Sequence, residues 1–124
     1  MRLALILLAS LLAPAAGAQG SAARGEAIAL SRSQGLCVLC HAVPGQNPAL
    51  QGTIGPPLAG VGSRLDAATL RQRLLAPERF NPDTVMPSYG RSTGLQQVAL
   101  AQRGQPLLTD AQVDDVVAWL GTLR

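Results

Sequence analysis

Apolar positions repeat at helical spacing in separate stretches of the chain, and no stretch alternates as a β-strand would. The final stretch is the clearest, because Thr109 and Gln112 form a capping box three residues apart. The apolar residues that follow have the spacing i, i+3, i+4, i+7 with two more beside them: Val113, Val116, Val117, Leu120, Trp119 and Leu123. This pattern predicts a final helix that begins after Thr109.

Two earlier stretches also predict helices. Residues 21–34 carry Ala23, Ala27, Ile28 and Leu30 near helical spacing, and Gly35 is a suitable stop. A second helix is expected after Asp66, which has the side chain of an N-cap. Its apolar stripe ends before a proline and consists of Ala67, Leu70, Leu74 and Leu75. A shorter helix is expected over residues 95–102.

Gly25 lies inside the first predicted helix, where glycine costs about 1 kcal/mol relative to alanine. A close crossing of helices would explain this residue. We therefore expect the first and last helices to cross with Trp119 near Gly25, and a frayed first turn is the alternative.

Residues 42–62 and 78–94 read as long loops rich in proline and glycine. Loops of this length are uncommon in a small domain unless they have a function. Aromatic residues are also scarce, since the chain has one each of phenylalanine, tyrosine and tryptophan. We therefore predict an all-α class in which the loops lie on a large, flat, apolar cofactor.

The first 18 residues have the anatomy of a secretory signal peptide, with Arg2, an apolar run and a small-residue cleavage site after Ala18. An uncleaved anchor is the alternative. The prediction leaves residues 19–124 as one domain in an oxidising compartment, the bacterial periplasm. No later stretch resembles a membrane span, so no membrane insertion is expected after cleavage.

The charges exclude some classes of partner. The chain has ten arginines, no lysine and seven acidic residues, with a net charge of +3. Losing Arg2 lowers this to +2. The scattered charges form no basic patch for nucleic acid, and a lysine ring for docking cannot exist.

Cys37, Cys40 and His41 form a Cys-x-x-Cys-His run that contains the only cysteines and the only histidine of the chain. This run is the attachment signature of a c-type haem. We predict one covalent haem c, held by thioethers from Cys37 and Cys40 and by His41 as an axial iron ligand. Too few ligands remain for a closed zinc site, and a thioredoxin-like dithiol expects a βαβ unit. A simple disulfide stays open as an alternative.

Counting also points to the second axial ligand, which in such proteins is a His, Met, Lys, Cys or Tyr side chain. Met1 leaves with the signal peptide, so Met86 is the only methionine of the mature chain. It lies in a loop between Pro82 and Pro87, and we predict that it binds the iron. Tyr89 and an open iron position are the alternatives. A thioether ligand raises the reduction potential, so we expect a site that takes electrons readily and does not bind oxygen.

The segment Gly55-Pro56-Pro57-Leu58 matches the Gly-Pro-x-Leu element that follows the haem motif in many cytochromes c. The resemblance implies that the carbonyl of Pro56 accepts a hydrogen bond from His41 and fixes the ring. A proline-rich turn without any haem contact is the alternative reading.

Beyond these motifs, nearly all of the mature chain resembles SoxX, the small monohaem subunit of the SoxAX complex of bacterial thiosulfate oxidation. The likeness is carried by residues 54–64, by Asp66 with Leu70 and Arg71, by residues 81–89 and by residues 104–120. It implies a small class I-like cytochrome c fold, with helices and long loops wrapped round one haem.

The same resemblance implies partners. These are a SoxA-like dihaem or monohaem cytochrome subunit, a SoxYZ-like carrier met through the complex, and a downstream cytochrome c acceptor. In that family SoxA carries the sulfur-reactive cysteine of an L-cysteine S-thiosulfotransferase. Once haem is attached, this chain keeps no free thiol and no spare histidine, so we expect it to relay electrons and not to be catalytic alone.

Two other functions stay open. A freely diffusing periplasmic monohaem carrier fits the same motifs. A peroxidase or gas sensor would need an open iron position, against which Met86 argues.

Overall fold

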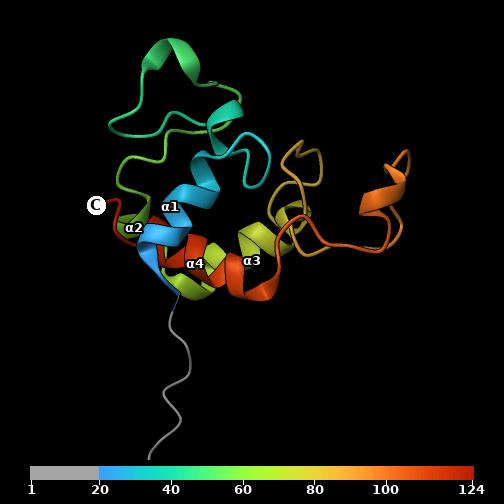
Figure 1. Cartoon of the computed structure of the whole chain (residues 1–124). Coiled ribbons are helices and arrows are strands. Elements are labelled where there is room, and N and C mark those ends of the chain that lie inside the picture. Colours follow the sequence, from blue (N-terminus) through green and yellow to red (C-terminus); the bar gives the residue numbers. More distant parts are fainter. Residues whose placement is uncertain (1–19) are drawn as a thin grey trace, which may run out of the picture.

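Helices and loops account for residues 20–124, the part of the chain that the computed structural model describes (Figure 1). No strand occurs within this range, and the predicted all-α class is confirmed. The α-helices in it are α1 (Ala22–Leu30), α2 (Val61–Arg64), α3 (Ala67–Leu75) and α4 (Asp110–Leu120). Single 3-10 turns also occur, at η1 (Cys37–Leu39), η2 (Pro48–Leu50), η3 (Pro77–Arg79) and η4 (Leu100–Gln102).

Helices α1 and α4 cross at Gly25, as predicted. A Cβ atom on Gly25 would collide with the backbone of Asp115 and would lie 2.9 Å from the Cβ of Trp119. Only glycine permits this approach. Trp119 is 4% exposed, and Gly25 is buried within α1, so the alternative of a frayed first turn is wrong.

A buried carboxylate fastens the start of α1 to α4. Asp115 accepts hydrogen bonds from Nε and Nη2 of Arg24, both at 2.8 Å, and from the backbone N–H of Ser21 at 2.6 Å. The hydrogen bond from Arg24, together with that from Ser21, holds the pKa of Asp115 below its ordinary value. Charge-assisted bonds of this kind are the strong ones.

Helix α3 packs on α4 beside this crossing. Its Leu70 and Leu74 are buried, and Arg71 bridges to Asp114 at 2.9 Å and to Asp110 at 2.8 Å. Asp66 caps α3 as predicted, accepting from the N–H of Thr69. The core that results is mainly aliphatic: Ile28, Ala29, Val38, Val43, Leu58, Val61, Leu70, Leu74, Leu108, Val113, Val116, Val117 and Leu120, with Tyr89 and Trp119.

Helix α1 is shorter than predicted, because it ends at Leu30 and not at residue 34. The chain then turns back, with the N–H of Gly35 bonded to Ile28 O at 3.0 Å and that of Leu36 bonded to Ser31 O at 2.9 Å. These wider turns replace the helical bonds. Ala23 and Ala27, which were expected on the apolar face, are exposed.

Two other predicted boundaries were wrong. The short helix α2 lies partly within residues 42–62. This stretch was expected to be a loop because Gly60 and Gly62 disfavour a helix. Of the helix expected over residues 95–102, only the turn η4 exists. Gln97 has a left-handed φ of 55°, which interrupts a helix, and no buried face supports these residues. Most helical stability in proteins comes from such packing.

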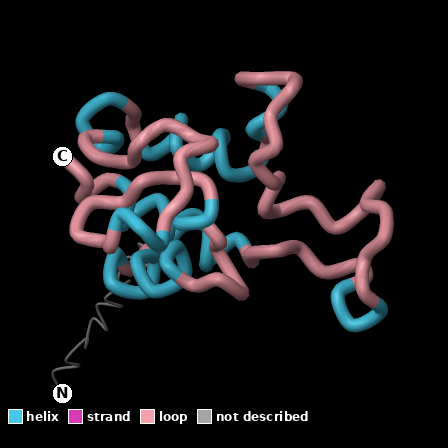
Figure 2. Tube along the Cα trace, turned by 90° about the horizontal axis from the view of Figure 1, so that it is seen from above, coloured by secondary structure: helices cyan, strands magenta, loops and turns pink. Residues whose placement is uncertain are grey.

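Residues 91–107, called the arm below, leave the body of the molecule as one long excursion (Figures 1 and 2). Both views show it extending away from the helices, with a short helical turn at its far end. No residue of the arm is buried. Its base is closed by the bond from Leu108 N–H to Tyr89 O at 3.1 Å.

The predicted signal peptide, residues 1–18, lies outside the described residues. From residue 20 onward, no helix is long and apolar enough to cross a membrane.

Candidate functional site

One cavity of about 820 Å³ collects every residue predicted for the haem site. Cys37, Cys40, His41, Pro56 and Met86 all line it, although the sequence separates the first from the last by nearly 50 positions. The volume is in the upper part of the range for cofactor pockets, roughly 300–1,000 Å³. Most other lining residues are apolar, drawn from α3 and the flanking loops.

The turn η1 places the two cysteines on one side of the chain. Cys40 N–H bonds to Cys37 O at 3.2 Å, and His41 N–H bonds to the same carbonyl at 2.9 Å. Both thiols are free, so the disulfide that the sequence left open is not formed. Burial raises the pKa of the Cys37 thiol to about 11, so this thiol stays protonated near neutral pH and is a poor nucleophile.

The imidazole of His41 is oriented by a backbone carbonyl. Its Nδ1 lies 2.6 Å from the oxygen of Pro56, and since a carbonyl only accepts, Nδ1 must carry the proton. The other nitrogen, Nε2, then keeps its lone pair and is the one able to bind a metal. The hydrogen bond implied by the Gly-Pro-x-Leu element is therefore present.

Gly55 brings the proline segment against the ring of His41. A Cβ atom at this position would lie 2.7 Å from Nδ1 and 2.8 Å from Nε2, closer than real side chains allow. Two backbone bonds tie the segment to the cysteine motif, Gly55 N–H to Cys40 O at 2.7 Å and Leu58 N–H to Ala42 O at 2.9 Å. Nothing in the sequence around Gly55 had indicated this role.

Met86 is half-buried and lies in residues 80–90, between η3 and the arm, called the Met86 loop below. Its N–H donates to Thr84 Oγ1 at 3.1 Å, a local bond that shapes the loop. Ser88 Oγ donates to Glu78 at 2.8 Å, and Arg91 forms an ion pair with the same carboxylate at 2.9 Å. These polar contacts fasten the loop to the turn η3 outside the cavity.

Three further residues line the cavity, and of these only Tyr89 was named from the sequence, as an alternative iron ligand: Arg73, Phe80 and Tyr89. The guanidinium carbon of Arg73, on α3, lies 4.2 Å from the ring centroid of Phe80, which follows η3. This is a cation–π contact. Tyr89 also lines the cavity, and its hydroxyl donates to Gly35 O. Burial raises the pKa of Tyr89.

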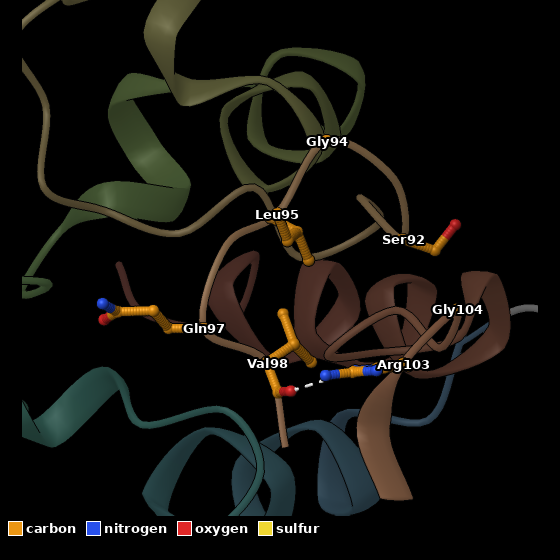
Figure 3. A pocket seen from close by; sticks show the side chains of 7 residues that line it. All are labelled: Ser92, Gly94, Leu95, Gln97, Val98, Arg103 and Gly104. Carbon is orange, nitrogen blue, oxygen red and sulfur yellow. Dashed lines mark hydrogen bonds between the residues drawn. The ribbon is translucent and has the colours of Figure 1, made fainter. Parts of the chain in front are cut away.

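A second, smaller pocket of about 240 Å³ lies entirely within the arm (Figure 3). Arg103 Nε points across it to the carbonyl of Val98 at 3.4 Å (Figure 3). Its walls contain no cysteine, histidine or methionine. It therefore has none of the side chains that the predicted haem chemistry requires.

Comparisons with known proteins agree with this geometry. The model of the family described as "Cytochrome c" matches residues 22–124. A chain in the crystal structure of SoxXA from P. pantotrophus is 33% identical, with a TM-score of 0.75 over 86% of this chain and 84% of that chain. A search of curated proteins gave no match. The likeness to SoxX predicted from the sequence is confirmed.

The cytochrome c family binds haem c covalently, and the residues here fit that group. The cavity wall is largely apolar, as a porphyrin face requires. It contains two free thiols three residues apart, one thioether, and one imidazole whose Nδ1 is already hydrogen-bonded to the Pro56 carbonyl. Gly55 keeps the space beside the imidazole ring clear of a side chain.

Proposed function

The chain belongs to the cytochrome c family, and on this premise we propose that it is the monohaem electron-transfer subunit of a SoxAX-type complex. An electron-carrying cytochrome c is the function the family implies. The finer proposal rests on the likeness to a chain of SoxXA over most of both chains and on the cavity that gathers the four haem-binding side chains.

Each of these side chains has a separate role in the proposal. Cys37 and Cys40 would hold the haem through thioethers, and His41 and Met86 would bind its iron. Bound haem supplies a one-electron iron couple. The carbonyl of Pro56 keeps the proton of His41 on Nδ1 and prevents the ring from turning. The cavity wall is largely apolar, which would favour the less charged, reduced state of a bound haem.

The chain itself carries no catalytic nucleophile in this proposal. Both cysteines are consumed by haem attachment, and no second histidine exists to act as a base. The sulfur chemistry of an L-cysteine S-thiosulfotransferase would therefore belong to a SoxA-like partner, with a SoxYZ-like carrier as substrate. This subunit would pass the electrons to a downstream cytochrome c in the periplasm, after removal of residues 1–18.

Co-purification tests the proposal against a free carrier. The tagged chain is expressed in a bacterium that oxidises thiosulfate and is isolated from the periplasm, and bound proteins are stained for covalent haem. We expect one second c-type cytochrome to co-elute in a constant ratio through size exclusion. A haem-loaded monomer with no affinity for a SoxA-like cytochrome would contradict the complex and favour the diffusible carrier.

A further inference from the structure

Tyr89 is the most firmly anchored residue of the loop that contains Met86. It is 3% exposed and lies three residues after Met86. Its N–H donates to Leu74 O on α3 at 3.0 Å, and its carbonyl accepts from Leu108 N–H at 3.1 Å. Met86 itself has only the local bond to Thr84. The loop is therefore attached to the body at Tyr89.

The hydroxyl of Tyr89 makes a third bond, to a distant part of the chain. It donates to the carbonyl of Gly35 at 2.5 Å. Gly35 directly precedes Leu36, which has a left-handed φ of 61°, and then Cys37. A left-handed leucine is strained and persists only where surrounding contacts enforce it. The Gly35 carbonyl belongs to the peptide bond that leads into this turn.

We propose that Tyr89 is a positioning residue that clamps the Met86 loop to the turn before Cys37 and so keeps Met86 at the iron. The inference rests on the proposed function, in which Met86 is an axial ligand. The Cys37 thiol also lies 3.6 Å from the Gly35 carbonyl, but a thioether sulfur has no hydrogen to donate. In the haem-loaded protein the Gly35 carbonyl therefore loses its remaining donor if the loop swings away. A buried acceptor left without a partner is costly, so the bond favours the state in which Met86 is bound.

Imidazole titration of the oxidised, haem-loaded protein measures how readily Met86 leaves. Imidazole binds iron only when Met86 has moved away, and its apparent Kd therefore reports the open population. In Tyr89→Phe we expect an apparent Kd about tenfold lower than in the wild type, equivalent to about 1.4 kcal/mol. The readout is loss of the methionine-sulfur-to-iron charge-transfer band.

Thr122→Val is the matched control. Thr122 Oγ1 donates to Trp119 O at 2.6 Å, so this variant also deletes one hydroxyl-to-carbonyl bond, but Thr122 does not line the cavity. We expect it to lower the thermal midpoint without changing the apparent Kd for imidazole. Equal Kd changes in both variants would mean that general destabilisation, and not the clamp, controls Met86.

Two further outcomes separate the clamp from the proposed ligand. If Met86→Ala removes the charge-transfer band but Tyr89→Phe leaves the imidazole Kd unchanged, Met86 is the ligand and the clamp is wrong. If the wild type has no such band, the ligand assignment itself fails.

Hydrogen exchange on the wild type provides a test that needs no variant. Saturating imidazole should increase exchange at the amides of Tyr89 and Leu108 if the loop opens as a unit. Unchanged protection at both amides, with Met86 displaced, would overturn the clamp even if Tyr89→Phe cannot be loaded with haem.

Discussion

Single residues determine how closely the chain surrounds the imidazole of His41. Gly55 lies so near the ring that a Cβ atom would meet both of its nitrogens, and the next residue, Pro56, supplies the carbonyl that holds Nδ1. The ring is therefore confined from one face and oriented at one edge. Such outer contacts set the geometry and basicity of a metal-binding histidine.

Gly55→Ala should disturb this contact directly. The added methyl must displace the ring or the loop, and we expect a loss of about 1–3 kcal/mol in the stability of the haem-loaded protein. Denaturant unfolding followed by haem absorbance measures it. Gly121→Ala is the control, because a Cβ atom there meets its nearest neighbours at 3.4 Å and beyond. A Gly55→Ala protein as stable as this control would contradict the packing.

Asp115 should make stability depend on acid pH. Its pKa is lowered in the fold, chiefly by Arg24, from an ordinary value of 3.8. The stability that ionised Asp115 contributes is therefore complete above about pH 4, and it is lost as the pH falls through the lower pKa that Asp115 has in the folded protein. Asp115→Asn should be less stable than the wild type at pH 7, and the gap should narrow below pH 4.

Unfolding curves between pH 3 and pH 7 measure this gap. Glu26→Gln is the control for the loss of one carboxylate, since Glu26 is exposed and does not line the cavity. A gap between Asp115→Asn and the wild type that stays constant across the whole range would rule out the titration of Asp115 as its cause.

The four side chains proposed to bind haem could be selected from the sequence, whereas contacts that depend on the fold could not. Cys37, Cys40 and His41 lie in one short motif, and Met86 was chosen because the mature chain has no other methionine, no lysine and no second histidine. The bond between Tyr89 and Gly35 joins positions 54 residues apart. Nothing in either local sequence indicates the other, because their proximity depends on how the Met86 loop packs on α3.

At the level of elements, the crossing of α1 and α4 supports the cavity indirectly, since Leu120 is the one residue of these two helices that lines it. The two helices touch at Gly25 and Trp119, while Arg24 and Asp115 join them beside this point. Helix α3 is then held on α4 by Arg71. These contacts fix the frame from which the cysteine turn and the Met86 loop reach the cavity.

Gly25→Ala tests the crossing through the sign of its effect. Helix propensity alone predicts that the free energy of unfolding rises by about 1 kcal/mol. The close approach predicts instead a loss of about 1–3 kcal/mol, because the backbone of Asp115 must move. Equilibrium unfolding decides between them, with Glu26→Ala as the control at an exposed neighbouring position. A more stable Gly25→Ala protein would show that the helices are not in tight contact.

Element boundaries followed from the sequence only where the signal was local. The capping box of Thr109 and Gln112 predicted the start of α4 correctly, since both partners lie in one turn. The end of α1 depends on bonds from Gly35 and Leu36 back to the helix. Those bonds form where the chain reverses its direction before the cysteine motif, and helical periodicity does not predict such a turn.

At the scale of the whole molecule, the body and the arm contribute differently to stability. The cavity, the helices and the aliphatic core all lie in the body. The arm has no buried residue, and Leu95, Leu100 and Leu107 are among its exposed side chains. Its ends meet at the bond between Tyr89 and Leu108, so a short connection could span its base.

Replacing residues 92–106 by a short Gly-Ser linker should therefore leave the haem-loaded body folded. We expect stability within about 0.5 kcal/mol of the wild type, because no buried contact is removed and loop closure depends weakly on length. Thermal unfolding followed by haem absorbance checks this. Failure to incorporate haem, or a large fall in the midpoint, would mean that the arm is part of the folding unit.

The proposal that one cavity holds a covalent haem bound by His41 and Met86 is tested by the oxidised absorption spectrum of the purified protein, compared with that of Met86→Ala. We expect a methionine-sulfur-to-iron charge-transfer band in the wild type and its loss in the variant, with haem still attached to Cys37 and Cys40 in both. A wild type without the band, or a variant that retains it, would contradict this assignment of the ligands.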